Sequence, residues 1–233
     1  MRFAMAPATS RSTALAFVRD GAMLFAGAAS AILPDLFAAF AGLPDGEPGL
    51  RLRRLPSLRS HLDPSGAIGA AAASVLGDRC RPVRAILFDK NPAANWTLGW
   101  HQDRTICVAA RRETPGFGPW TLKSGLHHVE PPFDLLAAMV TLRVHLDDVP
   151  ADNGPLLVAP GSHRLGRVAE REIDDIVRAC GRFACTAQAG DVWLQATPIL
   201  HASRAAARPA RRRVLQLDYS ALDLPGGLEW LEV

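Results

Sequence analysis

Short strand-like runs separated by turn signals fill the sequence from residue 82 onward, and they limit the possible folds more than any other feature. The runs are rich in Val, Ile, Leu, Phe and Thr, while Gly, Pro, Asn or Asp stand between them. Many short strands with tight turns predict a β-sandwich or β-barrel. The expected strands are residues 83–88, 95–110, 139–146, 156–158, 182–188, 192–195, 198–201 and 212–219.

The first 80 residues predict a mostly helical scaffold in front of the strand-rich core of residues 82–220. The second expected helix has Ser30 as an N-cap candidate and Pro34 in its first turns. A short strand is expected at residues 23–25, and the Gly-, Pro- and Arg-rich residues 43–64 predict a long surface connection. The three expected helices cover residues 10–20, 30–42 and 65–76.

Two segments interrupt the strand series. Residues 111–128 contain a Gly/Pro-rich stretch that predicts irregular structure, interpreted either as a lid over the barrel mouth or as an ordinary surface loop. Residues 165–180 predict a charged amphipathic helix that covers the sheet. The predicted class is therefore mainly β with flanking helices.

Composition favours one globular domain over residues 1–233. The chain is 48% hydrophobic and only 21% charged, which argues against disorder. Its net charge of +3 gives no reason to expect a nucleic-acid or membrane partner. The four cysteines lack metal-type Cys-x2-Cys spacing, and no apolar leader or membrane span is evident. Reduced thiols and a cytoplasmic location are therefore expected.

Three His-x-Asp triplets compete for the role of a metal site. Because side chains alternate along a strand, the His and Asp of such a triplet point the same way and can bind one metal ion together. A distant histidine, for which His201 is proposed, would complete a 2-His-1-carboxylate triad that leaves positions open for O2 and substrate. The triplets are His61/Asp63, His101/Asp103 and His145/Asp147.

Local context ranks these triplets without selecting one. Asp63 runs into Pro-Ser-Gly and is interpreted as a turn residue. His145 and Asp147 lie with Arg143 on the polar face of an alternating strand, so this pair stays open. Spacing alone favours His101/Asp103 over it only modestly.

Several motifs, in their order along the chain, resemble the phytanoyl-CoA dioxygenase family of Fe(II)/2-oxoglutarate oxygenases. The resemblance covers residues 14–220 and implies a double-stranded β-helix, the jelly-roll fold that cupins share. The motifs are Ile-Leu-Phe-Asp-Lys-Asn-Pro at residues 86–92, Trp-His-Gln-Asp at 100–103, Asp-Asn-Gly-Pro to Pro-Gly-Ser-His at 152–163, and His-Ala-Ser at 201–203 followed by Arg212.

The resemblance implies that His101, Asp103 and His201 bind Fe(II), with 2-oxoglutarate filling two of the open positions. Arg212, which follows His201 by 11 residues, would hold the far carboxylate of 2-oxoglutarate through a guanidinium fork. Strand alternation places Arg212 opposite Leu215 and Leu217 and does not by itself select it from its neighbours, so the family spacing decides. The other two implied co-substrate contacts are Ser203 and Arg143.

The implied reaction is O2-dependent decarboxylation of 2-oxoglutarate to succinate and CO2, coupled to hydroxylation of a small molecule. Relatives that halogenate lack the carboxylate ligand, so Asp103 argues against halogenation. Cationic candidates near the expected barrel mouth favour a substrate with a carboxylate or phosphate. The candidates for substrate contact are Lys90, Trp100, Trp120, Lys123 and His128.

Two other classes of function compete with the oxygenase. A cupin-like barrel that binds a metal ion or small molecule without turnover would keep the same ligands. A nucleic-acid-binding surface built on the arginines at 204, 208 and 211–213 ranks last, because no aromatic residue for base stacking follows until Tyr219.

Overall fold

Three antiparallel sheets are formed within residues 15–45 and 49–233, the residues that this computed structural model describes. The largest has the strand order β1-β11-β8-β13-β3-β2, the second β10-β9-β12-β4, and the smallest β5-β7-β6. The strands are β1 (Ala22–Phe25), β2 (Leu50–Leu52), β3 (Arg81–Lys90), β4 (Leu98–His101), β5 (Ile106–Val108), β6 (Trp120–Lys123), β7 (Leu126–Val129), β8 (Val140–His145), β9 (Leu156–Val158), β10 (Phe183–Cys185), β11 (Val192–Ala196), β12 (His201–Ser203) and β13 (Arg212–Ser220).

The six-stranded and four-stranded sheets are the two walls of the predicted jelly roll. Strands of both sheets line one interior cavity, with Arg143 and Arg212 contributed by the larger sheet and Leu156 and His201 by the smaller. The mainly β, double-stranded β-helix prediction is confirmed.

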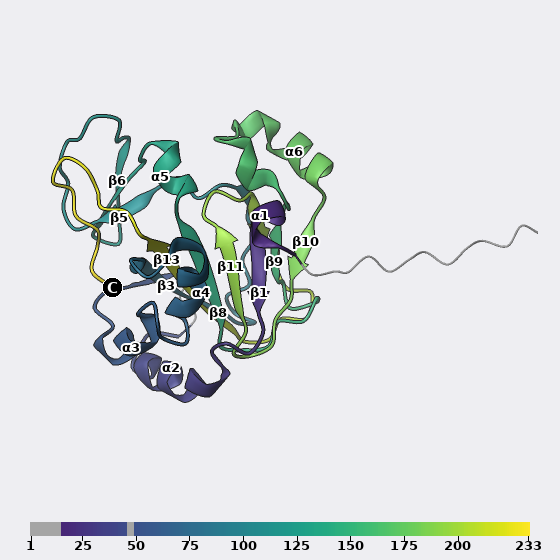
Figure 1. The fold of residues 1–233 in the computed structure, drawn as a ribbon. Helices are drawn as coiled ribbons and strands as arrows, with labels where there is room; N and C mark the ends of the chain where they lie inside the picture. Colours follow the sequence, from purple (N-terminus) through teal and green to yellow (C-terminus); the bar gives the residue numbers. More distant parts are fainter. Residues whose placement is uncertain (1–14, 46–48) are drawn as a thin grey trace, which may run out of the picture.

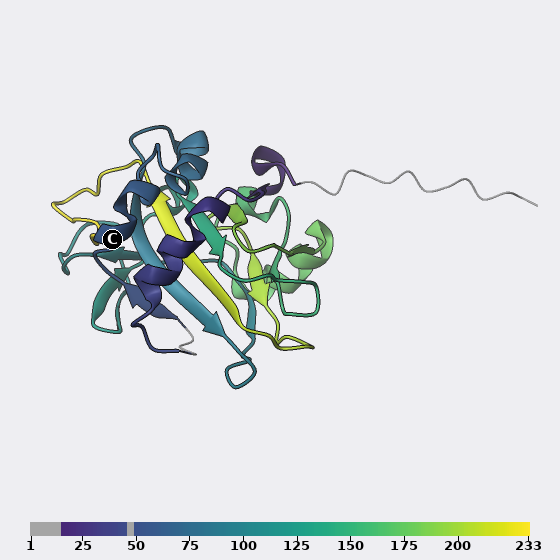
Figure 2. The same cartoon turned by 90° about the horizontal axis from the view of Figure 1, so that it is seen from below.

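Short helices cover the outer face of the six-stranded sheet (Figures 1 and 2). Their apolar side chains pack with Leu142, Leu194, Leu215 and Leu217 in the largest hydrophobic cluster. The Tyr219 hydroxyl reaches out of the sheet and donates a hydrogen bond of 2.9 Å to a helix carbonyl. The helices on this side are α2 (Leu33–Phe40), α3 (Arg59–Leu62) and α4 (Gly69–Leu76), with the 3-10 turns η1 (Ser30–Ile32) and η2 (Pro56–Leu58).

Strand alternation separates this apolar face from a polar interior. In β8, Leu142 and Val144 face the helices, whereas Arg143 lines the cavity. In β13, Leu215 faces the helices and Arg212 lines the cavity. The barrel interior is therefore the polar side of the sheet, and the outside is the main hydrophobic core.

The remaining helices of the described residues lie before β1, between β7 and β8, and between β9 and β10. None of the helices within the described residues is long and apolar enough to cross a membrane. They are α1 (Phe17–Asp20), α5 (Phe133–Ala137) and α6 (Ile173–Cys180), with the 3-10 turns η3 (Ser162–Leu165) and η4 (Glu170–Glu172).

Several sequence-based expectations were wrong in detail. Residues 120–129 are not irregular, because β6 and β7 form a hairpin through Ser124 and Gly125, both with positive φ, and pair with β5. Residues 43–64 are not a plain connection, since they include β2, η2 and α3. The helix expected over 165–180 is confined to α6.

Other expectations shifted at their boundaries. Ser30 begins the η1 turn and does not cap α2, whose first residue follows Ile32. The run at 95–110 divides into β4 and β5, and the strand at 23–25 is confirmed as β1. The helix expected over 10–20 is present only as α1, and its first part lies outside the described residues.

Candidate metal centre and adjoining cavity

Antiparallel pairing brings two distant histidines face to face. His101 ends β4 and His201 begins β12, and the two residues are direct cross-strand partners. Their ring centroids are 4.3 Å apart. Asp103 follows two residues after His101, and the potential ligand atoms of all three side chains lie within 4.8 Å of one another. No other cluster of this kind was found among the described residues.

Backbone carbonyls fix the orientation of both imidazoles. His101 Nδ1 is 2.8 Å from the carbonyl oxygen of Gly99, and His201 Nδ1 is 2.9 Å from that of Ile199. Because a carbonyl only accepts, each Nδ1 carries the proton and each Nε2 keeps its lone pair. This arrangement is typical of metal-binding histidines, whose second nitrogen is held by an outer hydrogen bond.

The charge state of the cluster also suits a cation. Burial lowers the pKa of His201 to about 4, which keeps this imidazole neutral at pH 7. Burial by itself would raise the pKa of Asp103, but the Arg84 guanidinium holds it below its usual value. Neutral imidazole and ionised carboxylate are the forms that bind metal. Two nitrogens and one oxygen therefore fit a first-row divalent metal such as Fe(II).

The other His-x-Asp triplets do not form such a cluster. His145 is buried in the cavity, where burial, Arg143 and Arg212 lower its pKa to about 3. Asp147 instead pairs with Arg213, at 2.7 Å. His61 lies 2.8 Å from Asp35.

A cavity of about 530 Å³ opens beside His201, between the two walls of the jelly roll. Its walls combine aromatic and aliphatic side chains with several buried polar groups. Three of those groups are cationic, and no carboxylate lines the cavity. The lining residues are Phe88, Lys90, Trp96, Leu98, Arg143, His145, Leu156, His201, Ser203, Arg212 and Val214.

The cationic groups converge on the same space. Lys90 Nζ donates to the Trp96 carbonyl oxygen at 2.6 Å and to Ser203 Oγ at 2.9 Å, and Arg212 donates to Ser203 Oγ at 3.5 Å. Arg212 also donates to the Gly154 carbonyl oxygen. Arg143 Nε is buried without a hydrogen-bond partner among the described residues.

Burial and mutual repulsion make these cations unfavourable without an anion. Burial, followed by the charges of Arg212 and Arg143, lowers the pKa of Lys90 to about 8. Burial, followed by Arg143, lowers the pKa of Arg212 to about 10. Buried charges in proteins are normally paired, so these unpaired cations indicate an anion-binding pocket.

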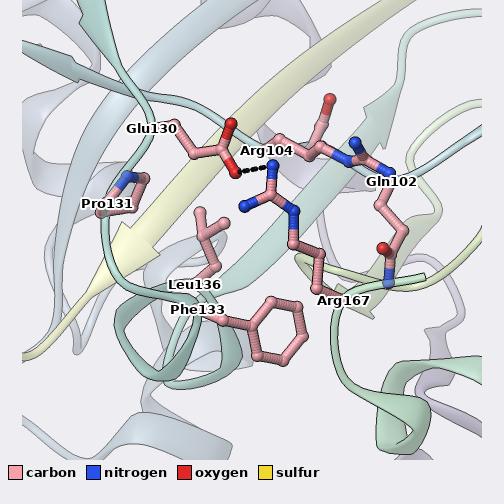
Figure 3. Close-up of a pocket in the computed structure, with 8 residues that line it drawn as sticks. Gln102, Arg104, Glu130, Pro131, Phe133, Leu136 and Arg167 are labelled. Atoms are coloured by element: carbon pink, nitrogen blue, oxygen red, sulfur yellow. Dashed lines mark ion pairs between the residues drawn. The ribbon is translucent and has the colours of Figure 1, made fainter. Parts of the chain in front are cut away.

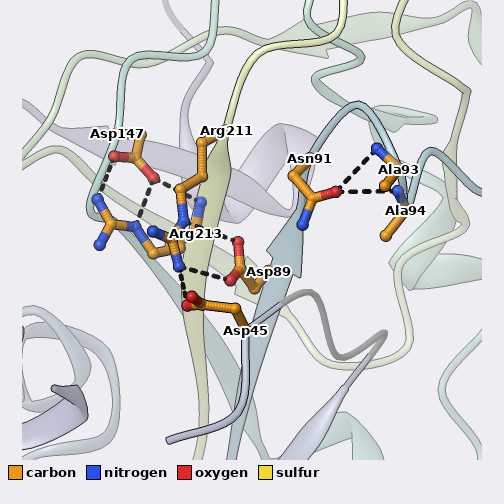
Figure 4. A network of polar contacts seen from close by, with 8 residues as sticks. All are labelled: Asp45, Asp89, Asn91, Ala93, Ala94, Asp147, Arg211 and Arg213. Carbon is orange, nitrogen blue, oxygen red and sulfur yellow. Dashed lines mark hydrogen bonds and ion pairs between the residues drawn. The ribbon is translucent and has the colours of Figure 1, made fainter. Parts of the chain in front are cut away.

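The three consecutive arginines at the start of β13, Arg211 to Arg213, have different surroundings, and Figure 4 shows the first and the third. Arg211 forms ion pairs with Asp45 and Asp89, and Arg213 binds Asp147 through two nitrogens. Arg212 points to the opposite face of the sheet and into the cavity. Arg212 is therefore the arginine of this run that is available to a ligand in the cavity. In the same view, the Asn91 side chain accepts two backbone N–H groups and closes the turn after β3.

Most of the proposed substrate contacts lie away from this cavity. Lys90 lines it, whereas Trp100 and His101 line an open hollow beside α6. Trp120, Lys123 and His128 all belong to the β6–β7 hairpin. That hairpin forms part of the small sheet and does not border the 530 Å³ cavity.

A second cavity, of about 270 Å³, borders Asp103 (Figure 3). Arg167 and Glu130 form an ion pair of 2.6 Å across it. Phe133 and Leu136, from α5, provide an apolar wall. The candidate metal centre thus has a cavity beside His201, a second beside Asp103 and an open hollow beside His101.

Sequence reasoning did not single out Arg84, although it contacts Asp103. The available signal was a charged residue within the otherwise apolar run of residues 83–88. It also missed Trp96 and Leu98 as cavity residues, since neither carries a motif-like signature.

Comparison with known proteins identifies the family to which the chain belongs. The phytanoyl-CoA dioxygenase (PhyH) family model matches residues 56–214, which is more than half of the chain. The chain belongs to the PhyH family. The resemblance seen in the sequence is thus confirmed, and the family is one of Fe(II)/2-oxoglutarate-dependent dioxygenases. No curated protein sequence gives a significant match.

Solved structures of similar fold include known 2-oxoglutarate complexes. HygX from Streptomyces hygroscopicus, with nickel, 2-oxoglutarate and hygromycin B bound, has 16% identity and a TM-score of 0.59, over 88% of this chain and 84% of HygX. EctD from S. alaskensis, with 2-oxoglutarate and 5-hydroxyectoine, has 19% identity and a TM-score of 0.61, over 92% and 79%. SnoK, an alpha-ketoglutarate-dependent carbocyclase from nogalamycin biosynthesis, has 18% identity and a TM-score of 0.57, over 87% and 80%. At these identities the likeness shows the fold alone.

Proposed function

We propose that this PhyH-family protein is an Fe(II)- and 2-oxoglutarate-dependent dioxygenase that hydroxylates a small molecule. One observation carries the proposal. The His101, Asp103 and His201 cluster adjoins a cavity with three cationic side chains, two buried and one half-buried, and no carboxylate. A metal site next to a pocket for an anion is what this co-substrate needs.

The metal ligands in this proposal are Nε2 of His101, Nε2 of His201 and one carboxylate oxygen of Asp103. The carbonyls of Gly99 and Ile199 support it, because they hold both rings with Nε2 free. When bound, Fe(II) would supply the O2 chemistry, and three protein ligands would leave positions open for it.

In this proposal the cationic side chains of the cavity bind 2-oxoglutarate. Arg212 and Lys90 would bind the far carboxylate of 2-oxoglutarate, with Ser203 Oγ between them, since it already contacts both cations. Charge-assisted hydrogen bonds of this kind are stronger than neutral ones and fix orientation. Arg143 would add a third positive group. Lys90 is therefore reassigned from a substrate contact to a co-substrate contact.

The main substrate would enter from outside this cavity. The apolar walls of the co-substrate pocket, including Phe88 and Leu156, would exclude water from the reacting centre. Asp103 keeps the carboxylate ligand that favours hydroxylation over halogenation. A small molecule with a carboxylate or phosphate remains the substrate class that we propose.

Turnover of 2-oxoglutarate without added substrate tests the proposal. Purified protein, loaded with Fe(II) under argon and then exposed to air, should convert 2-oxoglutarate to succinate, even at the slow rate expected without substrate. An Asp103→Ala variant, prepared in the same way, should release none above background. A non-catalytic cupin-like binding protein would instead bind the metal ion and produce no O2-dependent succinate at all.

A further inference from the structure

A buried polar chain continues inward from Asp103 and involves residues that the proposed reaction does not use. Arg84 of β3 is 3.3 Å from one Asp103 oxygen, Oδ2, through Nη2. Its Nε is 2.5 Å from Oδ2 of Asp218 in β13, an ion pair in which the Nε–H group lacks hydrogen-bond geometry. The side chains of Arg84 and Asp218 are only 10% and 3% exposed, whereas that of Asp103 is 24% exposed, so the Arg84–Asp218 contact is the better shielded from water.

Asp218 is itself held in place on its other oxygen. Thr141 Oγ1 donates to Asp218 Oδ1 at 3.0 Å, and Gln216 Nε2 donates to the same oxygen at 3.3 Å. Both donors come from strands that pair with each other in the six-stranded sheet. Asp218 is therefore a fixed anchor, and the guanidinium that it holds has little freedom to turn.

We propose that Arg84, anchored by Asp218, is a positioning residue for the metal centre: it fixes Oδ2 of Asp103 and leaves Oδ1 for a divalent metal ion. This inference rests on the proposed function, because it assumes that Asp103 is a metal ligand.

The chemistry of the two carboxylates explains why an arginine is needed. A guanidinium presents several N–H groups in a rigid plane, so it can contact Asp103 and Asp218 at once. A lysine has the same charge but a single nitrogen at the end of a flexible stem, and it cannot hold the two carboxylates in the same fixed geometry. Because Arg84 contacts both carboxylates, its single positive charge is shared between Asp103 and Asp218.

Structural stabilisation and metal positioning predict different results for Arg84→Lys. The substitution retains the charge, so any loss of metal affinity reports the lost geometry. Outer contacts to metal ligands typically contribute about 10- to 100-fold in metal affinity. We therefore expect Co(II) to bind Arg84→Lys about 10- to 100-fold more weakly than wild type, with an altered visible spectrum of the bound ion.

Arg213→Lys is the matched control. Arg213 binds a single aspartate, Asp147, through two nitrogens, on the opposite face of the sheet. Both substitutions remove a guanidinium that contacts carboxylates, one from β3 and one from β13, and both retain the charge. Arg213→Lys should change the melting temperature of the metal-free protein while leaving its Co(II) dissociation constant unchanged.

The experiment is calorimetric titration of the full-length chain with Co(II), without 2-oxoglutarate, alongside thermal melts of the metal-free proteins. Should Arg84→Lys fail to fold, Asp218→Asn provides the second variant. It keeps an oxygen for Thr141 but removes the counter-charge, and it should weaken Co(II) binding by about tenfold. A folded variant of either kind that binds Co(II) like wild type would overturn the positioning role. Wild type that binds no Co(II) would instead overturn the metal site, and with it the proposed function.

Discussion

The two faces of the six-stranded sheet carry opposite chemistries although the same strands build both. On the outer face, Leu142, Leu215 and Leu217 pack under the helices and form the main hydrophobic core. On the inner face, Arg143 of β8 and Arg212 of β13 line the cavity. The sheet thus separates residues that stabilise the fold from residues that are available to ligands. Substitutions on the two faces should accordingly have different consequences.

The largest effect is expected for metal binding by the candidate triad. Asp103→Ala removes the only carboxylate of the candidate triad, so we expect divalent metal affinity to fall more than about 100-fold, beyond the loss typical of outer contacts. His145→Ala should bind metal like wild type, because His145 lies in the cavity and outside the cluster. Metal content after dialysis, measured by elemental analysis, checks both. Loss of metal in His145→Ala with retention in Asp103→Ala would reverse the assignment.

A substitution on the outer face should lower the stability of the fold and leave the affinity for 2-oxoglutarate unchanged. Leu215 is fully buried under the helices, and Leu215→Ala should lower the free energy of unfolding by about 2–5 kcal/mol through lost contacts and a cavity. Urea unfolding measures this. The affinity of the folded variant for 2-oxoglutarate should match wild type. A large change in that affinity would show that the two faces are not independent.

The three arginines at residues 211–213 sharpen the comparison, because they differ in surroundings and not in residue type. Arg212→Gln should weaken 2-oxoglutarate binding by about 1.5–3 kcal/mol, the usual contribution of hydrogen bonds to a charged group. Arg211→Gln removes a guanidinium that already pairs with two aspartates and should leave this affinity unchanged. Calorimetry with the metal-loaded proteins distinguishes them. Equal losses in both variants would indicate a general charge effect instead of a specific contact.

A smaller, pH-dependent effect is expected from Lys90. In the ligand-free protein the pKa of Lys90 is lowered to about 8, so the ammonium that attracts an anion is lost as the pH rises above that value. The affinity for 2-oxoglutarate should therefore be highest below about pH 8 and fall above it, by at most about tenfold per pH unit for one proton. Lys90→Met should bind more weakly and show a flatter profile between pH 7 and 9. An unchanged decline in Lys90→Met would assign it to another group.

The local patterns in the sequence predicted much of the fold. Alternation in residues 140–147 and most of the short runs after residue 82 correspond to real strands, because side-chain period and turn residues are local properties. The strand expected over 198–201 was wrong, since only His201 lies in a strand. The β6–β7 hairpin was missed because its turn, Ser124-Gly125, follows a Gly/Pro-rich stretch that suggested a longer loop. A local signal for this hairpin was present but was outweighed by its neighbours.

The site was harder to predict, because it depends on which face of each strand points inward. Alternation placed Arg212 opposite the leucines of β13 and made it look misplaced for a core strand. The structure resolves this, since the leucines face the helices and the barrel interior is polar. Arg84 and Asp218 are 134 positions apart in the sequence (218 − 84), so no local pattern could pair them.

The triad and the cationic cavity should together bind Fe(II) and 2-oxoglutarate, and a visible spectrum of the anaerobic complex would show this binding. Wild-type protein mixed with Fe(II) and 2-oxoglutarate under argon should develop the weak visible charge-transfer absorption of the chelated pair. The absorption should be absent in Asp103→Ala and should need much more 2-oxoglutarate in Arg212→Gln. A folded wild-type protein that contains Fe(II) but shows no such absorption at saturating 2-oxoglutarate would contradict the account.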